Sequence, residues 1–254
     1  MTGSGAGFLD LPRRDAKPRS RGLTHVIDRG TPLAVFGGVV GSIADFADIW
    51  KFGWGTAYVD PSVQAKVELL RRHGVLSCPG GTLLEIASMR GRTDRLLGWA
   101  EDVGFTALEV SNGATEMIVA DKRRLIAEAS RRFVVFSEVG SKDPNVVLPA
   151  AAYEEEARAD LEAGALWVVL EGRESGTVGL YHQDGRVRED LAERVTAAVG
   201  LQRVVFEAPR KDQQAWFIRR FGPGCNLGNV APNDVLGLET LRLGLRADTL
   251  ALLR

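Results

Sequence analysis

The sequence has few residues of the two types that most often bind transition metals, because its 254 residues include only two cysteines and three histidines. Cys78 and Cys225 lack the close spacing of a metal site, and in a cytosolic chain both would stay reduced. His25 falls in a predicted strand, His73 near a helix end and His182 in a loop. These absences argue against a zinc site and against a catalytic triad built on histidine.

Long apolar runs and an excess of one charge are absent as well. No run approaches the roughly 20 residues that span a bilayer, and the first residues lack the basic-then-apolar layout of a secretion signal. With 32 basic and 33 acidic residues, the chain shows no general affinity for nucleic acid or anionic membranes. We therefore expect a cytoplasmic protein with no nucleic-acid and no membrane partner.

The chain does contain eight short apolar runs, rich in Val, Ile and Leu, separated mostly by helical segments. Runs without polar alternation are typical of parallel strands buried on both faces. Residues 1–20, rich in Gly, Pro and Arg, are expected to form a partly disordered N-terminal extension, and 21–254 to form one domain. That domain fits an α/β fold, a single (β/α)8 TIM barrel, which typically needs about 250 residues. An open doubly wound sheet is the alternative. The predicted strands are 23–28, 48–52, 75–78, 106–110, 133–138, 166–171, 202–207 and 225–229.

Helix signals lie between these strands. Asp60 and Pro61 resemble an N-cap followed by proline at the first helical position. Thr82 and Glu85 form a capping-box pattern, so both are interpreted as helix caps. Gly228 makes the eighth strand the weakest. The predicted helices are 32–44, 61–73, one that opens at residue 82, 93–103, 115–131, 150–163, 189–199 and 233–245.

Acidic residues recur where the predicted strands end. In a barrel, the carboxyl ends of all strands meet at the face that carries the active site. Carboxylates without His or Cys favour Mg²⁺, which typically takes one or two of them plus substrate oxygens. We expect two or three acids to face the site and the others to pair with basic residues. The strand-end acids are Asp28, Glu109, Glu138, Glu171 and Glu207, of which Glu138, Glu171 and Glu207 are the predicted metal ligands.

Three basic residues near these strand ends are catalytic candidates. Lys51 lies between Trp50 and Phe52 in a predicted strand, and a buried lysine is costly unless it is paired. Lys142, in the loop after the fifth strand, could act as a general acid, with an ordinary solvated lysine as the alternative. Arg173 stands between two acids and could grip a carboxylate, phosphate or sulfur oxyanion bidentately, unless it belongs to a structural ion-pair network.

The loops supply the candidates for substrate binding. Gly80 and Gly81 precede a helix start, where backbone N–H groups can bind an anion, although a plain turn is the alternative. Gly228 and Asn229 follow the eighth strand, a position where barrels often bind phosphate. Lys211 is a further candidate, either for the substrate or for pairing with a strand-end acid.

The segments taken together closely resemble the phosphosulfolactate synthase family, from about residue 8 to residue 250. The resemblance implies a (β/α)8 barrel and a lyase that, with Mg²⁺, adds sulfite to phosphoenolpyruvate to give (2R)-phospho-3-sulfolactate. In methanogens this reaction opens coenzyme M biosynthesis, and in some bacteria it leads to sulfolactate. The segments are FLDLPRRDAKPR, KFGWGT, PGGTLLE, EVSNG, SEVGSKD, EGRESG, FEAP, NLGN and LETLRLGLRADT.

The resemblance also carries residue roles to this chain. The family's proposed general-acid lysine falls on Lys142. Asn112 is a further predicted substrate-binding residue. Archaeal members tend to carry Asp at this position, so the sequence is more similar to the bacterial branch. The chain departs from the family pattern at Ala57, Cys78 and Gly228. The expected partners are phosphoenolpyruvate, sulfite and further copies of the chain in a homo-oligomer. The alternatives are a related enzyme that adds a different nucleophile to phosphoenolpyruvate and a non-catalytic, stress-associated binding relative.

Overall fold

Eight parallel strands form the centre of the computed structural model, which describes residues 7–11, 14–115, 117–143, 145–173 and 175–253. Neighbouring strands follow the order β3-β2-β1-β8-β7-β6-β5-β4, so the first strand pairs with the last. This arrangement confirms the predicted single (β/α)8 barrel and excludes the open sheet. The strands are β1 (Thr24–Asp28), β2 (Ile49–Phe52), β3 (Leu76–Cys78), β4 (Ala107–Val110), β5 (Val134–Val139), β6 (Trp167–Leu170), β7 (Val204–Glu207) and β8 (Asn226–Val230).

The barrel closes between β3 and β4 through Ser77 and Thr106. The N–H of Thr106 donates to the carbonyl of Ser77 at 3.2 Å. In return, the N–H of Ser77 donates to the Thr106 hydroxyl at 3.0 Å. A threonine side chain therefore takes the place of a backbone carbonyl where the two short strands meet.

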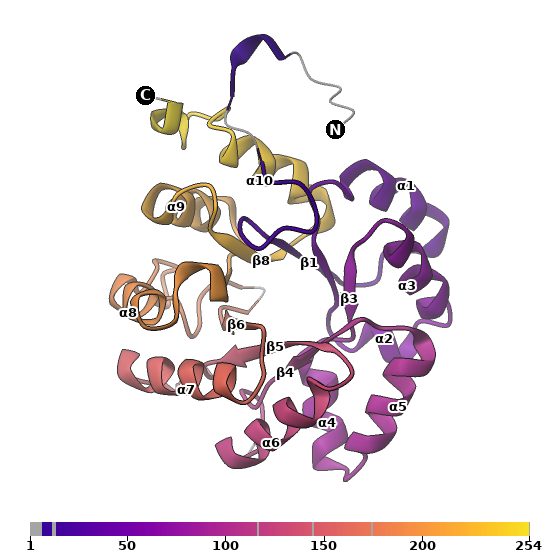
Figure 1. Ribbon diagram of the computed structural model, residues 1–254. Helices are drawn as coiled ribbons and strands as arrows, with labels where there is room; N and C mark the ends of the chain where they lie inside the picture. Colours follow the sequence, from indigo (N-terminus) through magenta and orange to yellow (C-terminus); the bar gives the residue numbers. More distant parts are fainter. Residues whose placement is uncertain (1–6, 12–13, 116, 144, 174, 254) are drawn as a thin grey trace.

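Helices surround the strands (Figure 1). The predicted helices are present, with ends that differ by up to four residues, whereas α2 and α9 were not predicted. No helix of the described residues is both long and apolar enough to cross a bilayer. The helices are α1 (Leu33–Ile43), α2 (Thr56–Val59), α3 (Val63–Arg72), α4 (Gly81–Met89), α5 (Thr93–Val103), α6 (Val119–Ala129), α7 (Ala150–Glu162), α8 (Glu189–Val199), α9 (Lys211–Phe221) and α10 (Val235–Arg242).

The two predicted helix starts are wrong in detail. α3 begins at Val63, because the Asp60 carboxylate accepts hydrogen bonds from the N–H and hydroxyl of Ser62 and so closes a turn before the helix. α4 begins at Gly81, with Gly80 as its N-cap residue at φ 84°. This start lies ahead of the predicted capping box, so Glu85 falls inside the helix and is free to contact the barrel mouth.

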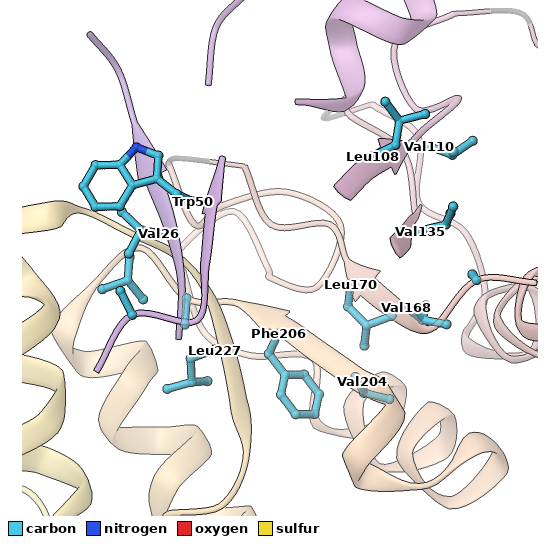
Figure 2. Close-up of a cluster of buried hydrophobic side chains, with 14 of the residues drawn as sticks. Val26, Trp50, Leu108, Val110, Val135, Val168, Leu170, Val204, Phe206 and Leu227 are labelled. Atoms are coloured by element: carbon cyan, nitrogen blue, oxygen red, sulfur yellow. The ribbon is translucent and has the colours of Figure 1, made fainter. Parts of the chain in front are cut away.

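Apolar side chains pack on both sides of the strands. Those that point outward meet the helices, and Val168, Leu170, Val204 and Phe206 of β6 and β7 belong to this layer (Figure 2). Those that point inward fill the barrel and form a buried layer, which we call the apolar floor: Leu23, Ile49, Cys78, Ala107, Phe136, Val169 and Val205.

The N-terminal extension lies against the opposite end of the barrel from the carboxyl ends of the strands. Lys17 donates to the carbonyls of Ala44 and Ala47 at the C-terminus of α1, where a cation is favoured by the helix dipole. Arg14 pairs with Glu239 of α10 at 2.6 Å. The first and last described residues lie on the same side of the barrel as α10 (Figure 1). The disorder predicted for the start of the extension falls on residues 1–6, which lie outside the described residues.

The closure between β3 and β4 gives a first test. Replacing Thr106 by Val keeps the shape but leaves the buried N–H of Ser77 without its acceptor. We expect the free energy of unfolding to fall by about 1–3 kcal/mol, measured by urea denaturation. Thr196→Val is the matched control, because the Thr196 hydroxyl has no partner in the described part of the chain. An equal effect in both variants would contradict the role of Thr106.

Candidate active site

Lys51 lies at the centre of a ring of carboxylates in the barrel mouth. Its ammonium is 3.1 Å from Glu207 Oε1, 3.2 Å from Glu109 Oε2 and 3.4 Å from Glu138 Oε1. Lys51 itself is only 5% exposed. Each of these residues follows an apolar-floor residue by two positions on its strand, and alternation with period two points both inward. The alternation that points apolar side chains into the barrel therefore also places the charged side chains in the next inward layer, above the apolar floor.

Lys142 is the second lysine of the site, and with 15% of its side chain exposed it is not a solvated loop lysine. Its ammonium donates to Ser111 Oγ at 2.6 Å, Glu138 Oε2 at 2.7 Å and Glu85 Oε1 at 2.9 Å. Glu171 Oε2 lies 3.8 Å away. Its backbone N–H donates to the carbonyl of Gly113. Main chain and side chain are thus both fixed.

Glu85 corrects the interpretation made from the sequence. It is completely buried, and it accepts hydrogen bonds from the Ser111 hydroxyl at 2.6 Å and the N–H of Ala114 at 2.8 Å, as well as from Lys142. The sequence predicted Glu85 to be a helix cap, so its contacts with Lys142 and Ser111 were not expected. Ser111 was also missed, because a serine after a strand carries no distinct signal in the sequence.

The loop after β6 holds Arg173 against two carboxylates. The N–H groups of Gly172 and Arg173 donate to Glu207 Oε2 at 2.8 and 2.9 Å, and the N–H of Arg173 also approaches Glu171 Oε1 at 2.8 Å. Arg173 has φ 55°, an uncommon conformation for a residue with a side chain. Its guanidinium donates to the carbonyl of Lys142 at 3.3 Å, so the loops after β5 and β6 are joined at the site.

These groups line a cleft of about 310 Å³ at the carboxyl ends of the strands. The first turn of α4 opens on it, although the Gly81 N–H already donates to Glu109 Oε1 at 2.9 Å. A Cβ at Gly81 would lie 2.8 Å from that of Ser111, so only glycine fits there. A wider hollow of about 1000 Å³ adjoins the cleft and shares Thr82, Lys142 and Arg173 with it. The predicted site residues that line the cleft are Lys51, Gly80, Gly81, Glu138, Lys142, Glu171, Arg173, Glu207 and Asn229.

The structure does not bring the other predicted residues to the cleft. Lys211 is exposed at the start of α9 and pairs with Asp248 at 3.1 Å. The amide of Asn112 donates to the carbonyl of Met117, within its own loop. Gly228 lies inside the barrel, where a Cβ would be 3.4 Å from His25 Nδ1. Asp28 accepts hydrogen bonds from Thr31 and Trp50, away from the cleft.

The acids outnumber the cations at this site. Lys51, Lys142 and Arg173 face Glu85, Glu109, Glu138, Glu171 and Glu207. If all were ionised, two negative charges would lack a partner in a buried setting, which is costly. Either protons or a divalent cation must balance them.

The pKa shifts reflect this imbalance. Burial, and then the Glu138 carboxylate, raises the pKa of Glu109 to about 8. Burial, and then Glu207, raises the pKa of Glu171 well above its usual value. Burial also acts on Glu138, but Lys142 and then Lys51 hold its pKa well below the usual range.

Both lysines remain charged. Burial by itself would lower the pKa of Lys51, but the surrounding carboxylates, Glu109 first, raise it well above its usual value. Burial opposes protonation of Lys142 as well, and Glu138 followed by Glu171 and Glu85 raises its pKa. His25 is different, since burial and then Lys51 lower its pKa well below the usual value, so it stays neutral beneath the ring.

Three buried oxygens at the cleft could contribute to a cation site. Glu171 Oε2 and Asn229 Oδ1 have no hydrogen-bond partner among the residues the structure describes. Glu109 Oε2 lies 3.2 Å from the Lys51 ammonium and 4.0 Å from His25 Nε2, without hydrogen-bond geometry to either. Such hard oxygen donors fit Mg²⁺.

The predicted trio of Glu138, Glu171 and Glu207 does not form a metal cage by itself. Glu138 and Glu207 turn oxygens toward Lys51. Within the described ranges, no three His, Cys, Asp or Glu side chains gather to hold a metal ion. A metal here would need oxygens from a bound ligand as well.

Comparison with known proteins shows the family to which the chain belongs. Residues 12–248 match the family model of (2R)-phospho-3-sulfolactate synthase (ComA). The phosphosulfolactate synthase of Methanothermobacter thermautotrophicus is 42% identical over 94% of this chain and 95% of its own length. That of Bacillus subtilis is 38% identical over 95% of this chain and 97% of its own. These identities do not separate an archaeal from a bacterial branch.

Among solved structures, the fold is similar to that of the YdjI aldolase from Escherichia coli K12. The TM-score is 0.56 at 16% identity, covering 84% of this chain and 76% of that chain. At this identity the likeness concerns the barrel alone.

The raised pKa of Glu109 predicts how stability depends on pH. Because its folded pKa is about 8, above the usual value of 4.5, the folded state keeps a proton that the unfolded chain has released. Stability therefore falls as the pH rises toward 8. In EDTA, the Glu109→Gln variant should show a flatter profile than the parent as the pH rises from the usual pKa of 4.5 to about 8, by on the order of 1 kcal/mol per pH unit. Urea unfolding at each pH measures this. Glu68→Gln, at an exposed ion pair, should match the parent; a Glu109→Gln profile parallel to the parent's would contradict the assignment.

Proposed function

The chain belongs to the (2R)-phospho-3-sulfolactate synthase family, and from this premise we propose that it adds sulfite to phosphoenolpyruvate, with Mg²⁺, to give (2R)-phospho-3-sulfolactate. One observation carries the proposal: Lys142 is held as an ammonium by Glu85, Ser111 and Glu138 at the wall of a cleft that Lys51 and Arg173 also line. A charged acid is therefore fixed at the wall of the cleft.

Binding of phosphoenolpyruvate needs partners for a phosphate and a carboxylate. The first turn of α4, with glycine as its N-cap residue, opens on the cleft and presents backbone N–H groups and the positive end of the helix dipole. Arg173 lines both the cleft and the wider hollow, where a guanidinium can bind an oxyanion with two parallel hydrogen bonds. The wider hollow gives the second anion, sulfite, a route to the same wall.

The proposed reaction forms one bond and moves one proton. The sulfur lone pair of sulfite attacks C3 of phosphoenolpyruvate, and the electrons of the double bond move to C2 and its carboxylate. The Lys142 ammonium then gives its proton to one face of C2, which sets the configuration, and the amine is protonated again from solvent. Despite burial, Glu138, Glu171 and Glu85 raise the pKa of Lys142, so the ammonium carries the proton at neutral pH that this step requires.

The predicted Mg²⁺ ligands are revised within this proposal. Glu171 and Glu109, with Asn229, are the residues that would hold the ion. One oxygen of each, Oε2 of the two acids and Oδ1 of the amide, lacks a hydrogen-bond partner in the part of the chain the structure describes. When bound, Mg²⁺ stabilises the negative charge that develops on the substrate carboxylate. Glu138 and Glu207 instead hold Lys51, and Glu138 also holds Lys142.

The departures from the family pattern do not favour a different nucleophile. Ala57 is buried in α2, Cys78 belongs to the apolar floor, and Gly228 lies beside His25. None of the three is among the residues lining the cleft. The predicted cytoplasmic location belongs with this proposal and is supported by Cys78 and Cys225, which are buried free thiols.

The direct test is to incubate the protein with phosphoenolpyruvate, sulfite and Mg²⁺ and identify the product by mass spectrometry. We expect a phosphorylated sulfonate whose mass equals the sum of both substrates, and no product when EDTA removes the metal. Restoring Mg²⁺ should restore turnover. The proposal would be falsified if no sulfonated product formed with Mg²⁺ present.

Lys142 is tested by replacement with Met, which keeps the length of the side chain but removes the proton. We expect kcat to fall by about 10²–10⁴-fold, the usual contribution of a general acid. Lys211→Met is the control, since that lysine is exposed and pairs with Asp248 away from the cleft, and it should retain full activity. Steady-state kinetics of both variants decide; unchanged kcat in Lys142→Met removes Lys142 as the acid.

A further inference from the structure

Another buried lysine, Lys122, lies outside the cleft and is not used by the proposed reaction. It is in the first turns of α6 and is 0% exposed. Its ammonium donates to the backbone carbonyl of Glu138 at 2.6 Å and to Glu156 Oε1 at 2.5 Å. Asp160 Oδ2 lies 2.8 Å away. One side chain thus joins α6, α7 and the end of β5 on the outer side of the barrel.

The Glu138 carbonyl, which accepts from Lys122, lies where β4 has ended and no longer supplies a hydrogen-bond donor. β4 ends at Val110, which stands opposite Ser137 in the register of β4 and β5. β5 continues to Val139, so Glu138 lies beyond the last residue of its neighbour. A buried carbonyl needs a donor, and the Lys122 ammonium supplies one at this position.

Ser137 and Asp160 reinforce the same point. The Ser137 hydroxyl donates to Asp160 Oδ2 at 2.6 Å, and that oxygen also receives Lys122. Two successive residues of β5, Ser137 through its side chain and Glu138 through its carbonyl, are therefore fixed from outside the barrel. A purely structural ion pair could have been placed anywhere between α6 and α7, whereas this one contacts the strand where the catalytic acid is supported.

Glu138 connects this network to the cleft. Its side chain points inward and contacts Lys142 at 2.7 Å and Lys51 at 3.4 Å, while its carbonyl is held from the other side by Lys122. We propose that Lys122 is a positioning residue: by fixing the backbone of Glu138, it sets where the Glu138 carboxylate holds Lys142 for proton transfer. This inference rests on the proposed function.

The test compares Lys122→Met with the double variant Lys122→Met/Asp160→Asn. Of the two acids that lose Lys122, Asp160 is fully buried whereas Glu156 is partly exposed, so neutralising Asp160 favours folding. In both, kcat for the sulfite addition should fall about tenfold or more, because small displacements of catalytic groups reduce rates strongly. KM for either substrate should change less than about threefold, since Lys122 does not line the cleft. A change confined to stability would leave kcat per folded molecule unaltered.

Lys66→Met is the matched control. Lys66 is 2% exposed and likewise joins a backbone carbonyl, that of Thr31, to an acid, Asp60. It should lose stability as Lys122→Met does but keep kcat within about twofold, because its contacts do not lead to Glu138. A folded double variant with parental kcat, or an equal fall of kcat in Lys66→Met, would overturn the proposal.

A crystal structure of the double variant separates this proposal from the function on which it rests. We expect the Glu138 carbonyl to shift and its carboxylate to lose the close contact with Lys142. If the parent protein forms no product, the function fails, and the position of Glu138 still decides the geometric claim. If the parent is active and Glu138 has not moved in the variant, only the role of Lys122 is refuted.

Discussion

The need to neutralise buried charge governs this barrel. Lys51 lies among carboxylates in a setting where a lone ammonium or a lone carboxylate would be strongly destabilising. Each acid of the ring therefore has a second fixed contact: Glu109 with the N–H of Gly81, Glu207 with the loop after β6, and Glu138 with Lys142. The loops at the mouth are ordered by the same contacts that balance the charge.

The apolar floor and the charged ring are two results of one periodicity. Along β2, β4, β5, β6 and β7, an inward apolar residue is followed two positions later by an inward charged one. Consequently the strand ends could be recognised from the sequence, and with them Lys51 and the acids. The barrel could be predicted for the same reason, since eight apolar runs of this length leave room for little else.

The features that sequence reasoning missed depend on contacts between distant segments. Glu85 had a local explanation as a helix cap, and only the position of Gly80 as N-cap residue turns it toward Lys142. Lys211 had the right charge but lies on the outer surface, where α9 places it against Asp248. The sequence also did not predict that β4 ends too early to bind the Glu138 carbonyl, which accepts from Lys122 instead. Each case concerns where a helix or strand starts or stops, which local patterns define least well.

Because β1 pairs with β8, the barrel cannot close until the last strand has been synthesised. The N–H of Leu23 donates to the side chain of Asn226, and the N–H of Leu227 donates to the carbonyl of Leu23. On the ribosome, β1 emerges about 200 residues before the strand that completes it, and until then its edge can pair with other chains. A nascent chain is therefore exposed to aggregation for most of its translation, and a chain ended before β8 would keep that open edge permanently.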